Sequence, residues 1–276
     1  MSSADIARQT WLTGWPAEPS RPASALTKGA RPGIGTVFGA VVVAMTKVAV
    51  VSGVGPGTGA AITRRFTAGG YRVAMLARDP ARLATLEKEI DGARAFPCDV
   101  TDEAQLDAVL AEVRGQLGAP SVLVHNAVGG AFGSFLDVDP GVLAYNFQVN
   151  VMGLFHLARR LAPAMVEAGA GVIVATGNTS AIRGKANFAG FAPTKAAQRI
   201  LAESMARDVG PKGVHVAYVV IDAVVDVPWT RALYANAPDA FFIQPAAIAD
   251  EIWHVAHQDR SAWSFNVEVR PFGESW

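Results

Sequence analysis

The sequence predicts an α/β fold with a doubly wound parallel sheet of about seven strands in a single domain. Short apolar runs alternate along the chain with amphipathic helical patterns, which is typical of a parallel sheet covered by helices. The apolar runs are continuous rather than alternating, so both faces of the sheet should be covered. Hydrophobic residues make up 51% of the 276 residues, enough for a large core.

The first 44 residues differ from this pattern. Pro16, Pro19, Pro22 and Pro32 interrupt any helical or strand periodicity, so we expect a poorly ordered N-terminal extension over 1–44, with Met45 as an alternative start. The folded domain is expected over 45–276. A Gly-Ile-Gly sequence at 33–35 follows no strand, and we interpret it as a chance imitation of a nucleotide-binding loop.

The first half of the domain is expected to contain strands at 48–51, 72–77, 95–98 and 121–124. A helix at 59–68 is indicated by Ile62 and Phe66, which lie four residues apart on one face. Asp79 and Pro80 form an N-cap and first-turn pair for a second helix. Thr101 is predicted to cap a third helix, whose apolar residues over 106–117 follow helical spacing.

The second half is expected to contain a long helix at 141–165, bent at Pro163. Further strands are expected at 171–175, 214–221 and 264–269, and further helices at 194–209 and 246–257. The segment 226–244 between them is rich in aromatic residues. In this fold it would form a lid that favours a bulky apolar substrate, or else an oligomer contact or simple packing.

Composition excludes several classes of function. The 24 basic and 24 acidic residues balance to a formal net charge of 0, so neither nucleic acid nor a membrane surface is an expected partner. No apolar run is long enough to span a bilayer. The single cysteine, Cys98, excludes an internal disulfide and fits a cytoplasmic protein. Glu251, His254 and His257 are interpreted as a solvated helix face, and no metal site is expected.

A glycine-rich segment, SGVGPGTG at 52–59, lies between the first strand and its helix. Gly53 permits the tight turn, Gly57 lets the backbone approach a pyrophosphate, and Gly59 allows close packing of helix on strand. The helix N-terminus adds N–H donors and a positive dipole. The segment therefore predicts a dinucleotide site.

The end of the second strand indicates which dinucleotide is preferred. Arg78 stands there and can form a fork of hydrogen bonds to a 2′-phosphate, which favours NADP. Asp79 follows and keeps NAD open as the less favoured alternative, although its role as a helix cap already explains it.

These residues resemble the short-chain dehydrogenase/reductase (SDR) family over about 47–276. The segment 52–59 is similar to the family's Thr-Gly-x-x-x-Gly-x-Gly loop, and Asp99-Val100 to its Asp-Val pair. His125-Asn126-Ala127-Val128 stands where Asn-Asn-Ala-Gly is usual. Asn150 matches the asparagine of the long helix, and Lys195 matches the lysine of Tyr-x-x-x-Lys.

The resemblance implies a Rossmann-like fold, bound NADP(H), a small-molecule substrate and a homodimer or homotetramer. The residues that it implies for the cofactor are Ser52, Gly53, Gly57, Thr58, Gly59, Arg78, Asp99, Val100, Asn126, Ala127 and Lys195. For catalysis it implies Asn150 and Lys195, and Asn178, which stands at the family's serine position, is a further candidate.

Three positions depart from the family pattern. Phe191 stands four residues before Lys195, where the family has tyrosine, and Asn178 stands at the serine position. Asp222-Ala223 replaces the usual Pro-Gly after the sixth strand. The family reaction needs a phenol to exchange a proton with the substrate oxygen, and a phenyl ring has no such proton.

Three interpretations follow. Asn178 could position the oxygen while Lys195, or a water held by Asn150, moves the proton of an apolar carbonyl or alcohol substrate. Alternatively, the protein binds NADP as a regulatory or partner pseudoenzyme with little catalysis. In the third interpretation the pocket serves a reaction that needs no phenol, such as a non-redox elimination. Tyr145 and Tyr218 are interpreted as core or surface residues rather than replacement phenols, and His125 as a packed residue rather than a base.

Overall fold

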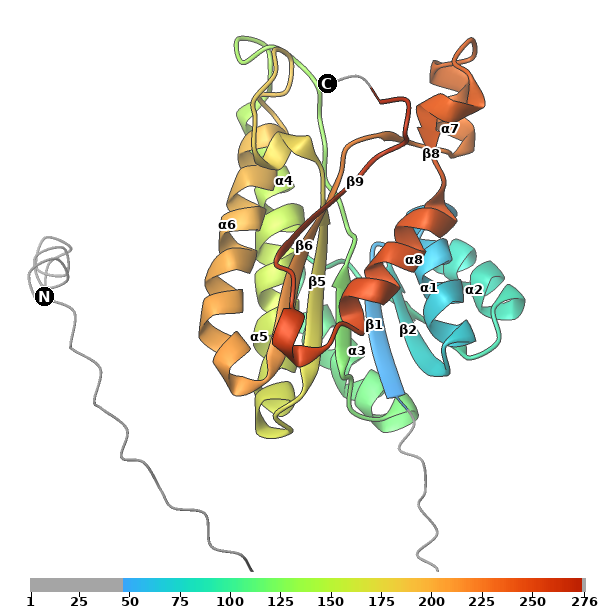
Figure 1. The fold of residues 1–276 in the computed structure, drawn as a ribbon, viewed down its shortest axis with the longest axis vertical. Coiled ribbons are helices and arrows are strands. Elements are labelled where there is room, and N and C mark those ends of the chain that lie inside the picture. Colours follow the sequence, from blue (N-terminus) through green and yellow to red (C-terminus); the bar gives the residue numbers. More distant parts are fainter. Residues whose placement is uncertain (1–46, 275–276) are drawn as a thin grey trace, which may run out of the picture. The chain divides into compact units, whose positions relative to one another are not determined.

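The computed structural model describes residues 47–274, and the extension predicted over 1–44 lies outside them (Figure 1). Seven parallel strands form one sheet in the order β3-β2-β1-β4-β5-β6-β9. The strands are β1 (Lys47–Ser52), β2 (Tyr71–Ala77), β3 (Ala93–Pro97), β4 (Val122–His125), β5 (Gly171–Gly177), β6 (Val214–Ile221) and β9 (Asn266–Val269). The predicted fold class is confirmed.

Helices cover both faces of this sheet. They are α1 (Thr58–Ala68), α2 (Pro80–Glu89), α3 (Glu103–Leu117), α4 (Pro140–Phe147), α5 (Gly153–Glu167), α6 (Ala192–Val209), α7 (Pro228–Leu233) and α8 (Pro245–Ala256). Apolar side chains of α3, α5 and α6 build the core on one face. Those of α1, α2 and α8 build the core on the other face (Figure 1).

Two separate cores explain the continuous apolar strands. In β1, Val48 and Val50 point into one core, whereas Ala49 and Val51 point into the other. All four residues are fully buried. Successive side chains of a strand point to opposite faces, so a strand covered on both sides needs an apolar residue at every position.

The strand order places a crevice at the carboxyl edge of the sheet. The chain proceeds outward from β1 to β3 and then returns to β4 on the other side of β1, where Ser52 pairs with His125 in the register. The loop after β1 leads to α1 on one face, and the loop after β4 leads to α4 and α5 on the other. Diverging loops of this kind leave room for a ligand between them.

The predicted cap of α3 is wrong by one residue. Asp102 is the N-cap, and its side chain accepts a hydrogen bond of 3.0 Å from the Gln105 backbone N–H. The Thr101 hydroxyl instead donates to Asp99 Oδ1 at 2.8 Å. The Thr101 side chain, which the sequence suggested as a cap, is therefore hydrogen-bonded to Asp99 instead. The predicted cap of α2 is confirmed, since Asp79 accepts from the Arg82 N–H.

The long helix is interrupted at a different place from the one predicted. The α4 helix ends at Phe147, a π-helical turn spans Gln148–Met152, and α5 continues from Gly153 with Pro163 in its interior. A π-turn inserts an extra residue and rotates the side chains that follow. Here it carries Asn150, which is fully buried.

The segment predicted as a lid has its own short elements. Strands β7 (Val224–Val225) and β8 (Phe242–Ile243) pair in parallel, and α7 lies between them in the chain. Figure 1 shows α7 and β8 above α8, beyond the carboxyl edge of the main sheet. Within residues 47–274, none of the helices has the length and apolar character needed to cross a membrane.

Candidate functional site

A groove of about 870 Å³ follows the carboxyl edge of the sheet. Its walls come from the ends of β1, β2 and β4, from the segment after β3, and from α4. Six of the residues predicted to bind a cofactor line it: Gly53, Arg78, Asp99, Val100, Asn126 and Ala127.

The glycine loop is tightly packed against its surroundings. Gly53 has a φ of +78°, and a Cβ there would collide with the backbone of Ala127. A Cβ on Gly59 would lie 2.7 Å from the Gly53 carbonyl oxygen, so the helix can approach the loop only with glycine at this position. Gly57 is covered by Val227, whose Cγ1 would lie 2.6 Å from an added Cβ.

Five predicted cofactor residues lie outside the groove wall, and one of them, Lys195, is described separately below. Gly57, Thr58 and Gly59 begin α1, where Gly57 is the N-cap and makes no side-chain cap. Ser52 is fully buried, and its Oγ shares a hydrogen bond of 2.9 Å with His125 Nδ1. Burial lowers the pKa of His125 to about 3, so the ring is neutral and packed, as the sequence suggested.

Asn126 connects three strands at the groove floor. Its Nδ2 donates to the Gly53 carbonyl oxygen at 2.9 Å, and its Oδ1 accepts from Thr176 Oγ1 at 3.1 Å. These bonds tie the loop after β4 to the glycine loop and to the end of β5. Asn126 therefore connects three segments of the groove floor through its side chain.

Charged residues gather where β2 ends. Arg78 is exposed in the groove and donates from Nη1 to the Tyr145 hydroxyl oxygen at 2.7 Å. Asp79 is engaged elsewhere, because Oδ1 accepts the Arg82 backbone N–H and Oδ2 lies 3.4 Å from Arg82 Nη2. The carboxylate therefore acts as a cap and in an ion pair, whereas the Arg78 guanidinium, among residues 47–274, donates to a neutral hydroxyl.

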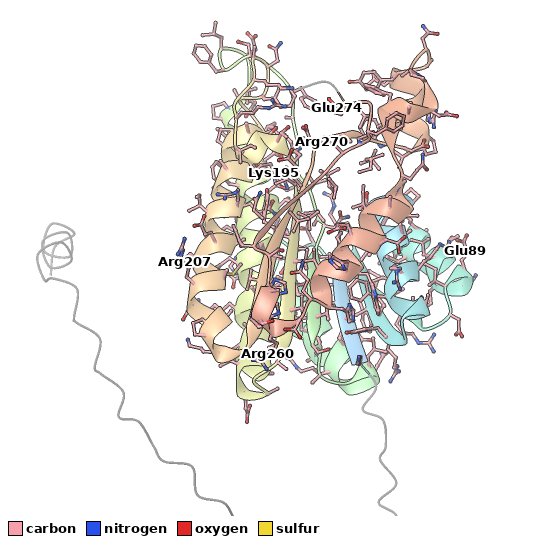
Figure 2. All side chains as sticks on the ribbon, in the orientation of Figure 1. Glu89, Lys195, Arg207, Arg260, Arg270 and Glu274 are labelled. Carbon is pink, nitrogen blue, oxygen red and sulfur yellow. The ribbon has the colours of Figure 1, made fainter. Side chains whose placement is uncertain are left out.

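Lys195 lies on the inner side of α6 and is only 3% exposed. Its Nζ donates to the Thr176 carbonyl oxygen at 3.0 Å and to Gln198 Oε1 at 2.7 Å. Figure 2 places Lys195 in the upper half of α6, towards the carboxyl edge of the sheet, whereas Arg207 lies further down the same helix. Burial lowers the pKa of Lys195 to about 7, because the charged amine loses its hydration.

Asn150 acts as a clamp between the loop after β4 and α6. Its Oδ1 accepts from the Gly129 N–H at 2.9 Å, and its Nδ2 donates to the Gly129 carbonyl oxygen and to Thr194 Oγ1, both at 2.8 Å. Its own carbonyl oxygen accepts from Gln198 Nε2 at 2.8 Å. All polar groups of the Asn150 side chain are thus used within the protein.

Phe191 and Asn178 lie at the ends of the elements that carry them. Phe191 precedes α6 as its N-cap residue, is 6% exposed, and has its ring centroid 6.0 Å from Lys195 Nζ. Asn178 follows β5, and its Oδ1 accepts the Ser180 N–H as the cap of a short 3₁₀ turn. Among residues 47–274, its amide nitrogen makes no hydrogen bond, so it can donate to a ligand.

Gln198 was missed from the sequence. It is fully buried and joins Lys195 Nζ to the Asn150 carbonyl oxygen through the two ends of its carboxamide. Tyr218 packs against this pair, with its hydroxyl 3.3 Å from Gln198 Oε1, and burial raises its pKa. The signal for Gln198 was its position three residues after Lys195, on the same helix face.

Apolar side chains are exposed on both sides of the carboxyl edge. Phe132, Phe135 and Leu136 lie in the loop after β4, and Trp229 and Leu233 lie on α7. Each is more than half exposed. Figure 1 shows that loop and α7 on opposite sides of the edge. Asp222, the residue after β6, has its Oδ1 3.7 Å from Arg183 Nη2, so its carboxylate is paired.

The sequence matches the short chain dehydrogenase family over residues 47–236. It is 32% identical over 183 residues to the 7alpha-hydroxysteroid dehydrogenase of Escherichia coli (strain K12), covering 65% of this chain and 71% of that protein. It is 30% identical over 193 residues to the L-xylulose reductase of Bos taurus, covering 70% and 77% of the two chains.

Solved structures are also similar to this chain. A metagenomic short-chain oxidoreductase in complex with NADP superposes with a TM-score of 0.71 at 30% identity, over 82% of this chain and 97% of that chain. The 3-ketoacyl-(acyl-carrier-protein) reductase of Brucella melitensis, complexed with NADH, gives a TM-score of 0.74 at 25% identity, over 81% and 96%.

Proposed function

The chain belongs to the short-chain dehydrogenase family, and from this premise we propose that it is an NADP(H)-dependent oxidoreductase of SDR type. Its proposed substrate is an apolar carbonyl compound or the corresponding alcohol. Its proton path is proposed to work without the tyrosine of the family. The observation that carries the proposal is Lys195, which is buried and donates hydrogen bonds to the Thr176 carbonyl oxygen and to Gln198 Oε1.

The preference for NADP rests on the charges at the end of β2. The Asp79 carboxylate is engaged with Arg82 on α2, through the Arg82 backbone N–H at 3.0 Å and Arg82 Nη2 at 3.4 Å. Within the described part of the chain Arg78 has no acidic partner in the groove, and it can pair with a 2′-phosphate. Among similar structures, one contains NADP and another NADH, so the family accommodates both cofactors.

A bound nicotinamide cofactor would supply or accept a hydride in the reaction. The residues of this chain would then have to position the substrate oxygen and exchange its proton. The amide nitrogen of Asn178 can donate a hydrogen bond to that oxygen. Lys195 has a pKa of about 7, so near neutral pH its amine is protonated in part of the molecules and can hold or release the proton.

Phe191 also supports a second candidate function, an NADP-binding regulatory or partner protein with little or no catalysis. Its ring centroid lies 6.0 Å from Lys195 Nζ, and a phenyl ring has no proton to exchange with a substrate oxygen. The Lys195 amine donates hydrogen bonds to Gln198 and to the Thr176 carbonyl oxygen within the core, and such bonds are compatible with a structural role as well as a catalytic one. The two candidates share the cofactor and differ only in turnover.

The exposed apolar side chains at the carboxyl edge support an apolar substrate. Phe132 and Phe135 on one side and Trp229 on the other are 69–78% exposed, and they would bury apolar surface against a bulky ligand.

The homodimer or homotetramer implied by the family remains part of the proposal, and sedimentation of the purified protein tests it.

The experiment that tests the proposal has two steps. Titration of the protein with NADPH, followed by fluorescence, measures binding, and NADPH oxidation is then measured against a panel of apolar ketones and aldehydes. Turnover of any carbonyl compound, lost in Lys195→Met, supports the oxidoreductase. Tight binding without turnover on any substrate supports the regulatory protein, and absence of NADPH binding contradicts both.

A further inference from the structure

Two residues of the groove wall, from different elements, form a hydrogen bond with each other. Arg78 stands at the end of β2, and Tyr145 lies on α4, 67 positions later in the chain. The Arg78 guanidinium donates to the Tyr145 hydroxyl oxygen at 2.7 Å. Both residues line the groove, and Tyr145 is 40% exposed. The bond therefore joins the two elements at the end of the groove where β2 finishes.

The choice of partner matters for the charge of Arg78. Arg82, the other arginine in the groove wall, lies within 3.4 Å of the Asp79 carboxylate, which compensates its charge. A tyrosine hydroxyl fixes a guanidinium without neutralising it. Arginine has five N–H donors and the bond to Tyr145 uses one, so the others remain for an anion. The Tyr145 hydroxyl accepts this bond, and its own hydrogen stays available.

The bond also restricts the motion of a long side chain. A free arginine has many rotamers, and ordering it on binding a ligand costs part of the binding free energy. A partner that already holds the guanidinium in the groove reduces that cost before the ligand arrives. The benefit is confined to ligands that contact the guanidinium.

We infer that Tyr145 is a positioning residue that holds the Arg78 guanidinium in place for the 2′-phosphate of NADP(H) and so sets the preference for NADP over NAD. This inference rests on the proposed function, because it needs a dinucleotide in the groove. It assigns a role in selectivity to a residue of α4, on a different element from the arginine.

The test compares the wild-type protein with Tyr145→Phe by calorimetry. The ligands are NADPH, NADH, adenosine 2′,5′-bisphosphate and 5′-AMP. We expect Tyr145→Phe to weaken NADPH and adenosine 2′,5′-bisphosphate by about three- to tenfold, the cost of ordering one long side chain. NADH and 5′-AMP, which lack the 2′-phosphate, should bind with unchanged affinity. Tyr234→Phe is the matched control, since Tyr234 is 42% exposed and is not part of the groove wall.

The double variant Arg78→Ala/Tyr145→Phe separates positioning from direct contact. If Tyr145 acts through Arg78, removing its hydroxyl has no further effect on NADPH once Arg78 is absent. A persisting effect there would mean that the hydroxyl contacts the phosphate itself, and the positioning role would be wrong. Equal weakening of NADPH and NADH by Tyr145→Phe, or no weakening of either, would also overturn it.

The outcomes for the wild-type protein keep the two proposals apart. If wild type binds NADPH more tightly than NADH and Tyr145→Phe leaves the ratio unchanged, only the role of Tyr145 is refuted. If wild type binds neither dinucleotide and neither adenine nucleotide, the proposed function fails and the role of Tyr145 fails with it.

Discussion

Lys195 Nζ lies 2.7 Å from Oε1 of Gln198, which stands one turn further along α6. Gln198 in turn connects the amine to the π-turn at Gln148–Met152. The other end of the Gln198 carboxamide donates to the Asn150 carbonyl oxygen at 2.8 Å. Lys195, Gln198 and Asn150 thus form a continuous buried chain of hydrogen bonds. The position of the amine relative to the groove is set by this chain, whether the protein turns over substrate or only binds a cofactor.

We expect Phe191→Tyr to create or raise carbonyl reductase activity. The Phe191 ring centroid is 6.0 Å from Lys195 Nζ, and the ammonium form of Lys195 would favour ionisation of a phenol placed there. The measurement is NADPH oxidation with a panel of ketones and aldehydes. The double variant Phe191→Tyr/Asn178→Ser should exceed either single variant, because both groups act on one substrate oxygen.

Phe188→Tyr is the control for this change, since it adds a phenol three residues earlier, against the Phe132 ring. It should leave activity unchanged. If the unaltered protein turns over briskly and Phe191→Tyr is slower, the protein uses another proton path and the regulatory function is excluded.

Arg78→Ala should remove most of the difference in affinity between NADPH and NADH. Hydrogen bonds to charged groups contribute about 1.5–3 kcal/mol, or roughly ten- to a hundredfold in affinity. The loss should fall on NADPH, with NADH little affected. Fluorescence titration of both cofactors measures it, and equal affinities in the wild-type protein would refute the assignment to NADP.

The free energy of unfolding should rise more steeply with pH in the wild-type protein than in the Lys195→Met variant. Burial lowers the pKa of Lys195 from 10.5 to about 7, so between these values the unfolded chain binds a proton that the folded protein lacks. The free energy of unfolding therefore increases as pH rises above 7. The contribution of Lys195 to it is least favourable below pH 7. Urea unfolding of wild type and Lys195→Met at about pH 7 and about pH 9 measures the difference. An identical change in both proteins would show that the lysine is charged in the fold.

Gly59→Ala should destabilise the protein by about 1–3 kcal/mol, whereas Gly55→Ala should have little effect on stability. A Cβ on Gly59 would lie 2.7 Å from the Gly53 carbonyl oxygen, and neither backbone can move without disturbing the loop. A Cβ on Gly55 meets nothing within 4 Å. Thermal unfolding of the two variants tests this, and equal stabilities would mean that α1 shifts at little cost.

The sequence by itself determined the sheet, its helices and the edge where the groove lies. These depend on local patterns, namely continuous apolar runs such as 48–51, the cap at Asp79 and the glycine loop at 52–59. The spacing of four residues between Phe191 and Lys195 corresponds to about one helical turn, which brings the two side chains together at the start of α6. Contacts over such short separations follow from the geometry of one element, which the sequence specifies.

Only the tertiary structure decided the partners of these residues. The π-turn that buries Asn150, the contact of Val227 with Gly57 and the bond from Arg78 to Tyr145 join segments far apart in the chain. Asp102 caps α3 in place of the predicted Thr101, whose hydroxyl donates to Asp99. Packing between elements selects among alternatives that are locally equivalent, and for that reason no local pattern in the sequence records the outcome.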